Sequence, residues 1–186
     1  LVCGPLNGTV IASDTIDVTM LDDDVAPPVL FSQVTASAAE PDVIDLQLSV
    51  DPESEYPISF TVVAVAGTAT AGSDYLFEPL LVELAPNAAP FLIDVEILDD
   101  NLGELAETFT LTITDPVNVQ TGSESVVTIL ANDQPGLSIA ATTDVQEDAG
   151  TAEVALTLTN PASYQVSALV STSDVEAVAG VDYTGL

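Results

Sequence analysis

Residues 43–50 read VIDLQLSV, and this run decides the fold class of the chain. Apolar side chains occupy every second position from Ile44 to Val50, and polar side chains stand between them. A period of two directs one face of a β-strand into a core and the other into solvent, as in an antiparallel sheet. The same alternation recurs in FLIDVEIL (91–98) and in the run 107–114, and no stretch shows a convincing helical period. The chain is therefore predicted to be all-β.

Short runs of this kind fill the middle of the chain. Stretches rich in Pro, Gly, Asn and Asp separate them, as expected of turns. Seven short strands in about 100 residues are typical of a two-sheet, immunoglobulin-like antiparallel β-sandwich. The predicted strands are 29–37, 43–50, 58–66, 80–84, 91–98, 107–114 and 124–131.

The chain also repeats itself. Glu147 follows Glu40 by 107 positions, and Asp182 follows Asp74 by 108. VTMLDDD at 18–24 likewise matches VTILAND at 127–133, an offset of 109. A period near 108 residues is the size of one domain. We therefore expect an excerpt of a longer polypeptide, with the last strand of one repeat in 1–26, a complete domain in 27–134 and the first half of another in 135–186.

Composition excludes several function classes. The chain has 30 acidic residues, no Lys, Arg or His, and a formal charge of −30. Nucleic acid and anionic membranes would repel it. A Ser–His–Asp triad, a Schiff base and a His-ligated zinc are all impossible, so we do not expect an enzyme. The longest uninterrupted apolar run, 62–66, is too short to insert in a membrane. The acidity is explained either by bound cations or by a solvated acidic surface.

The acidic loops are predicted to meet. If successive strands reverse direction, the connections after the first, third, fifth and seventh strands lie at one end of the sandwich. Those connections contain Glu40, Asp74, the run LDDNLGELAE (98–107) and Asp133. Converging carboxylates repel one another unless a cation lies between them. Ca²⁺, which takes about six to eight oxygen ligands, suits such a site. The alternative for Asp74 is a turn residue that accepts a hydrogen bond from its own backbone.

Four motifs carry a resemblance to a known family. VQEDAGTAEVALTL, GTATAGSDY, VEILDDNLGELAETFTLTI and VTILAND occur in the chain. Together they resemble the Calx-beta repeat, a module of sodium/calcium exchangers, integrin beta-4 and large microbial surface proteins. The resemblance implies an immunoglobulin-like sandwich with calcium sites at one end in the members that bind the ion. It carries over as metal ligands Glu40, Asp74, Asp99, Asp100, Glu104 and Asp133 in the complete repeat, Glu147 and Asp182 in the following one, and Asp22, Asp23 and Asp24 from the preceding one.

Two departures from the family pattern also lead to expectations. The complete repeat ends in AND where the preceding tail ends in DDD, so Asn132 replaces an acid and is expected to weaken one ion position. Glu107, at the start of its strand, is expected to face solvent rather than a metal.

The hypothesis that follows is a calcium-binding structural or adhesive module of a large extracellular or cell-surface protein, in which Ca²⁺ stiffens the junctions between repeats. Its expected partners are Ca²⁺, neighbouring repeats, and other copies in a filament or a cell-surface receptor or matrix. Two alternatives stay open at this point. One is a filament subunit joined by donated strands or half-domains, and the other is a calcium-sensing regulatory domain of a membrane protein.

Overall fold

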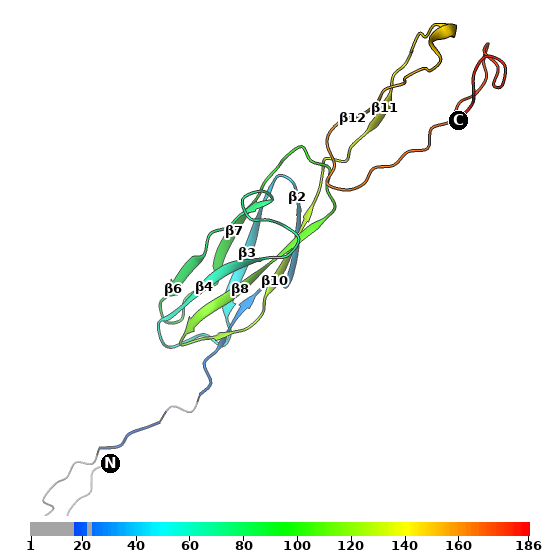
Figure 1. Ribbon diagram of the computed structural model, residues 1–186. Helices are drawn as coiled ribbons and strands as arrows, with labels where there is room; N and C mark the ends of the chain where they lie inside the picture. Colours follow the sequence, from blue (N-terminus) through cyan, green and yellow to red (C-terminus); the bar gives the residue numbers. More distant parts are fainter. Residues whose placement is uncertain (1–16, 22–23) are drawn as a thin grey trace, which may run out of the picture.

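The computed structural model describes residues 17–21 and 24–186 of the chain. A two-sheet β-sandwich occupies the middle, and a hairpin lies beyond one of its ends (Figure 1). Within the described residues there is no α-helix, only the short 3₁₀ turn η1 (Glu147–Ala149), and hence no long apolar helix of the kind that spans a bilayer. The strands are β1 (Pro28–Phe31), β2 (Thr35–Ala39), β3 (Asp42–Val50), β4 (Ile58–Ala66), β5 (Tyr75–Leu76), β6 (Leu80–Leu84), β7 (Phe91–Ile97), β8 (Glu107–Val117), β9 (Gln120–Thr121), β10 (Ser125–Leu130), β11 (Leu137–Ile139) and β12 (Leu156–Leu158).

The sandwich is made of two five-stranded sheets. One has the order β5-β7-β3-β1-β9 and the other the order β2-β10-β8-β4-β6. The pairings are antiparallel except β1 with β9 and β2 with β10, which are parallel. The predicted all-β sandwich is confirmed.

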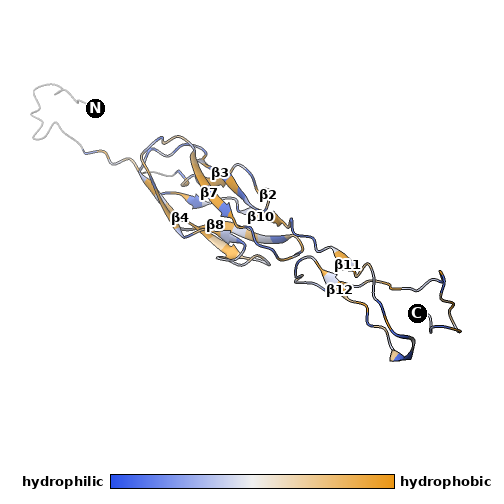
Figure 2. Cartoon of the chain, turned by 90° about the horizontal axis from the view of Figure 1, so that it is seen from above, coloured by the Kyte–Doolittle hydropathy of each residue, from blue (hydrophilic) through white to orange (hydrophobic). Residues whose placement is uncertain are grey.

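The core follows the alternation that the sequence predicts. On β3, Leu46 and Leu48 are at most 2% exposed, whereas the alternating residues Asp45 and Gln47 face solvent. Hydrophobic residues concentrate in the strands that face each other across the sandwich (Figure 2). Each fully buried aliphatic or aromatic side chain contributes about 1.5–3 kcal/mol to folding. This burial holds the two sheets together without internal ion pairs, which a chain lacking Lys, Arg and His cannot form.

The predicted first strand, 29–37, was wrong as a single element. It is two strands in different sheets, because the chain crosses between the sheets at residues 32–34. On the near side of the crossing, Ser32 N–H donates to Gln47 O (2.9 Å). On the far side, Val126 N–H donates to Val34 O (3.0 Å). The phase of the buried positions changes at the same place, from odd-numbered residues in β1 to even-numbered residues in β2. Two short strands, β5 and β9, were also not predicted.

Strand directions agree with the prediction of successive reversals. The registers place Ala39 beside Leu130, and Asp42 and Tyr75 beside Ile97. As a result β2, β4, β7 and β10 all finish at one end of the sandwich. The loops that contain Glu40, residues 67–74, 98–106 and 131–133 meet there, and this end is called the acidic end below.

Residues 135–186 repeat the strand pairing of β1 with β3. Leu137 pairs with Leu158 in the β11–β12 hairpin, just as Val29 pairs with Val50, each 108 positions earlier. The periodicity of the sequence therefore extends to the register of hydrogen bonding.

Candidate metal centre at the acidic end

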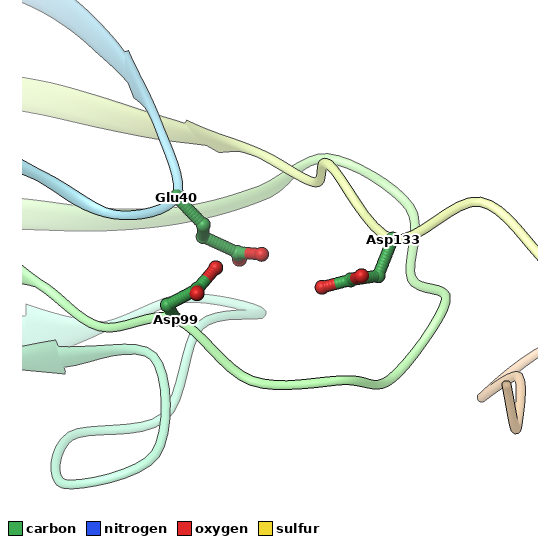
Figure 3. Close-up of side chains that lie close together, drawn as sticks. All are labelled: Glu40, Asp99 and Asp133. Carbon is green, nitrogen blue, oxygen red and sulfur yellow. The ribbon is translucent and has the colours of Figure 1, made fainter.

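Three loops place carboxylates against one another at the acidic end. Glu40 follows β2, Asp99 follows β7 and Asp133 follows β10. One carboxylate oxygen from each lies within 4.8 Å of the others, and Figure 3 shows the three groups turned toward a common space. These residues are called the first triad.

A second triad lies at the same end. It consists of Asp74, Glu104 and Glu107, again with one carboxylate oxygen of each within 4.8 Å of the others. All three residues are half-buried. Asp74 comes from the loop between β4 and β5, Glu104 from the loop between β7 and β8, and Glu107 begins β8. The β7–β8 loop, residues 98–106, therefore contributes a carboxylate to each triad.

Asp74 also closes the turn that carries it. Thr70 N–H donates to Asp74 Oδ2 (2.6 Å), and Asp74 N–H donates to Thr70 O (3.0 Å). Gly72 has φ +86°, a conformation that glycine adopts without strain, and its N–H donates to Tyr75 O (2.8 Å). Tyr75 then stacks on Phe109 with ring centroids 4.0 Å apart. The turn alternative for Asp74 is thus correct, and the same carboxylate belongs to the second triad.

The turn recurs around Asp182. Val178 N–H donates to Asp182 Oδ2 (2.9 Å), and Gly180 has φ +83°. Tyr183 is half-buried where Tyr75 is fully buried, and its hydroxyl donates to Asp174 Oδ1 (2.6 Å). The local sequence therefore specifies this turn, whatever surrounds it.

Three glutamate carboxyl groups of the acidic end have raised pKa values, because they are partly buried and lie close to other negative charges. Burial and then the hydrogen bond and charge of Asp74 raise the pKa of Glu107 from 4.5 to about 7. Burial, followed by the charges of Asp100 and Glu104, also raises the pKa of Glu40. Burial and then the charge of Asp74 raise the pKa of Glu104. Charge repulsion and burial both destabilise the ionised carboxylates, so a proton or a bound cation stabilises each group.

One oxygen of the first triad has no partner within the protein. In the described part of the chain, two buried side-chain oxygens accept no hydrogen bond, Glu40 Oε2 and Ser125 Oγ. A buried carboxylate oxygen without a donor is costly unless a cation binds it. The donor set of the first triad therefore fits a hard cation.

The other predicted ligands have different positions. Asp100 belongs to neither triad, and its Oδ1 accepts Leu102 N–H (2.7 Å). Asp24 is exposed and precedes β1 at the end of the sandwich opposite to the acidic end. Asp22, Asp23 and the side chain of Glu147 lie outside the described residues.

Asn132 lies beside the first triad, where its weakening of an ion position stays a prediction, and Glu107 departs from expectation. Asn132 Nδ2 donates to the backbone O of Glu40 (2.7 Å) and to Asp99 Oδ1 (3.0 Å), so it ties two loops of the first triad together. Glu107 does not point away into solvent, since its carboxylate lies in the second triad. Its place on the inner face of β8, though not its partners, could have been found from the strand pattern. Glu107 has the same parity as the core residues Phe109 and Leu111, which places it on the inner face.

The β7–β8 loop also contacts the residues that follow the sandwich. Gly103 N–H donates to Pro161 O (2.8 Å), and Ser163 N–H donates to Gly103 O (2.9 Å). Gly103 is buried, and a Cβ at this position would lie 2.5 Å from Pro135 Cδ. Asn160 Nδ2 donates to Asp133 O (2.6 Å). The loop that supplies both triads is therefore docked between the chain segment after β10 and the turn after β12. This arrangement is called the Gly103 junction.

Comparison with known families agrees with the motifs and the fold. The model of the Calx-beta domain matches residues 22–135 and again residues 131–186. The chain belongs to the Calx-beta family. The resemblance inferred from the sequence is thus confirmed. Curated proteins contain no match to the chain.

Solved structures of Calx-beta domains share the sandwich. The apo-form Calx CBD1 domain is 20% identical over 57% of this chain and 97% of its own, with a TM-score of 0.54. CBD12 from CALX1.2 is 20% identical over 57% of this chain and 46% of its own, with a TM-score of 0.54. The calcium binding domain CBD12 of CALX1.1 is 20% identical over 56% of this chain and 44% of its own, with a TM-score of 0.51. At this identity the likeness establishes the fold.

Proposed function

We propose that the acidic end binds Ca²⁺, and that the bound ions brace the junction between consecutive Calx-beta repeats. One observation carries the proposal. Asp99 and Glu104 stand on the same short loop as Gly103, so the ligands of both triads and the contact with the following residues belong to one segment. An ion that orders this loop also orders the junction.

The ligand geometry suits Ca²⁺. Its bonds to oxygen are about 2.3–2.6 Å long, so two ligands of one ion lie at most about 5 Å apart. The oxygens of each triad, within 4.8 Å of one another, satisfy that limit. Backbone carbonyls and water would complete a shell of about six to eight oxygens. The similar CBD12 of CALX1.1 is a calcium binding domain, which points to the same ion.

The ion would relieve the repulsion within the triads. Ca²⁺ bound by the first triad would give the orphaned Glu40 Oε2 a partner, and in the second triad it would replace the proton that Glu107 holds near neutral pH. Because the ion binds only the folded arrangement, each site would add about 2.7 kcal/mol of stability at 100 times its dissociation constant.

We infer an extracellular or cell-surface setting, in which the chain acts as a structural or adhesive module. Sites of extracellular modules have dissociation constants of about 10⁻⁴–10⁻³ M, and millimolar calcium fills them. The absence of Lys and Arg leaves no cleavage point for trypsin-like proteases, which suits an exposed fibre. Neighbouring repeats are the nearest partners, and other copies or a surface receptor are further ones.

Calorimetric titration of the 186-residue chain with Ca²⁺ tests the proposal. Asp99→Asn removes one charge from the first triad, and Glu107→Gln removes one from the second. Asp115→Asn is the matched control, because it makes the same chemical change at the opposite end of β8, at φ +51°, which Asn tolerates. We expect each triad variant to lose or weaken binding at least tenfold and the control to bind like the wild type.

The bracing is measured separately, by exchange of the Ser163 amide with and without calcium. Slower exchange with calcium is expected. Equal losses of binding in all three variants, or no binding at 10 mM calcium, which is roughly ten times above the module range, would show that the acids are only a solvated surface.

A further inference from the structure

The Gly103 junction has a counterpart surface at the opposite end of the sandwich. Gly103 lies between two walls, the segment that contains Asp133 and Pro135 and the turn at 160–163. Because the sequence repeats, both walls have equivalents before and inside the complete domain. Asp24 precedes Asp133 by 109 positions, and the DP pair at 51–52 precedes the NP pair at 160–161 by the same offset.

These equivalent walls enclose a groove. Residues 24–27 form one side and residues 52–56 the other, around a cavity of about 660 Å³. Val25 is 76% exposed and Tyr56 is 58% exposed, so large apolar groups on both walls face the solvent. The space that Gly103 fills at the following junction is therefore open here.

The walls of the groove are already held in place. Pro27 O accepts Gln120 N–H (2.9 Å), which fixes the entering segment to the sandwich. Asn118 Nδ2 donates to Pro57 O (2.8 Å), and Ser54 Oγ accepts Tyr56 N–H (3.2 Å), which fix the turn. These bonds fix one end of the entering segment and the turn opposite to it.

We propose that this groove receives the β7–β8 loop of a Calx-beta repeat directly N-terminal to it in the same polypeptide. The loop would dock as residues 102–104 dock against residues 133–135 and 160–163. The continuity of the walls with the observed junction identifies the occupant, because the same two segments of the repeat meet the same kind of loop. The calcium-braced junction shares this contact, but the docking itself does not require the ion.

Charge distinguishes the two junctions. The turn of the groove carries Glu53 and Glu55, whereas the following turn carries Ala162 and Tyr164 at the equivalent positions. A β7–β8 loop with acids like Asp99 would be repelled in the groove. Salt screens such exposed charges over about 10 Å at 0.1 M. Docking in the groove should therefore strengthen as ionic strength rises, and the Gly103 junction should change less.

The test uses a chain extended by one repeat, in which a copy of residues 27–130 directly precedes residues 22–186. This replacement keeps the strand sequence before the groove, since VTIL at 127–130 takes the place of VTML at 18–21. It also removes Cys3, so introduced cysteines react alone.

Cross-linking with a short bifunctional thiol reagent then compares three cysteine pairs in dilute solution. The test pair joins Leu102→Cys of the added copy to Glu53→Cys of the original chain. The positive control joins Leu102→Cys of the original chain to Ala162→Cys, beside the observed Gly103 bridge. The negative control joins Leu102→Cys of the added copy to Ser73→Cys at the acidic end of the original repeat.

We expect the test pair to cross-link at least tenfold faster than the negative pair, and Gly103→Val in the added copy alone to abolish that advantage. A test pair that cross-links no faster than the negative pair would overturn the proposal. Failure of the positive pair to cross-link would also overturn it, because the Gly103 junction from which the proposal is argued would not exist. The measurement is made in calcium and in chelator. Cross-linking in both supports groove docking even if calcium bracing fails, and cross-linking only in calcium would overturn the proposal that docking does not require the ion.

Discussion

Gly103→Ala is the sharpest test of the junction, because the structure allows its effect to be calculated. The added Cβ would lie 2.5 Å from Pro135 Cδ and 2.8 Å from Asp133 O, which is too close for either contact to persist. The β7–β8 loop must then withdraw from the turn at 160–163. It loses two hydrogen bonds, Gly103 N–H to Pro161 O and Ser163 N–H to Gly103 O. At about 0.5–1.5 kcal/mol for each bond, docking weakens by about 1–3 kcal/mol, or roughly 5- to 150-fold.

Amide hydrogen exchange of Ser163, followed by NMR in chelator, measures this change directly. We expect its protection to fall by the calculated factor, while amides in the sandwich, such as that of Val95, exchange as in the wild type. Gly136→Ala is the matched control in the same segment. Its Cβ would meet Thr159 Cγ2 at 3.3 Å, which a shift of a few tenths of an ångström relieves. Unchanged exchange of Ser163 in a folded Gly103→Ala variant would refute the docking of the loop.

Three further predictions concern the sandwich and its acidic end. In chelator, raising the pH from 4.5 through 7 should lower the free energy of unfolding measured in urea. The reason is that folding raises the pKa of Glu107 to about 7, so Glu107 loses its proton at a higher pH in the folded chain than in the unfolded one. Millimolar calcium should reverse this trend. Tyr75→Ala should cost about 3–5 kcal/mol and lower the melting temperature, since it removes a buried ring stacked on Phe109, whereas Tyr56→Ala, at an exposed position, should change little. Asp74→Asn should weaken calcium binding in calorimetry without lowering the melting temperature in chelator, because an amide oxygen can still accept the hydrogen bond from Thr70 N–H. Asp74→Ala should lower both the calcium affinity and the melting temperature. An Asp74→Ala variant as stable as the wild type would contradict the role of Asp74 in the turn.

The strands of the sandwich could be predicted because their signal is local. Side-chain parity in β3 and β7 requires only neighbours in sequence, and the predicted bounds 43–50 and 91–98 differ from the observed ones by one residue at one end. The meeting of the acidic loops followed from the same signal, since reversal of each strand places alternate connections at one end. Glu40, Asp99 and Asp133 come together for that reason.

Other features depended on which strands pair. The crossing between the sheets after Phe31 follows from bonds to Gln47 and Val126, residues that are distant in sequence. Glu107 joined the second triad because β8 begins beside the turn of Asp74, a neighbourhood set by the partners of β8. No periodicity in the sequence reports such neighbours.

By itself, the sequence determined the period-two strands, the repeat near 108 residues, the turn around Asp74 and its copy at Asp182, and the exclusion of chemistry that needs Lys, Arg or His. The strands and turns depend on a residue and its near neighbours, and the repeat and the exclusion need only a comparison or a count along the chain. Only the tertiary structure decided which carboxylates share a site and that Gly103 is the point of contact with the following turn. Both depend on distances between loops that the packing of the two sheets sets. The turn residue and the candidate ligand are therefore the same aspartate, because local hydrogen bonds orient Asp74 and long-range packing supplies Glu104 and Glu107 beside it.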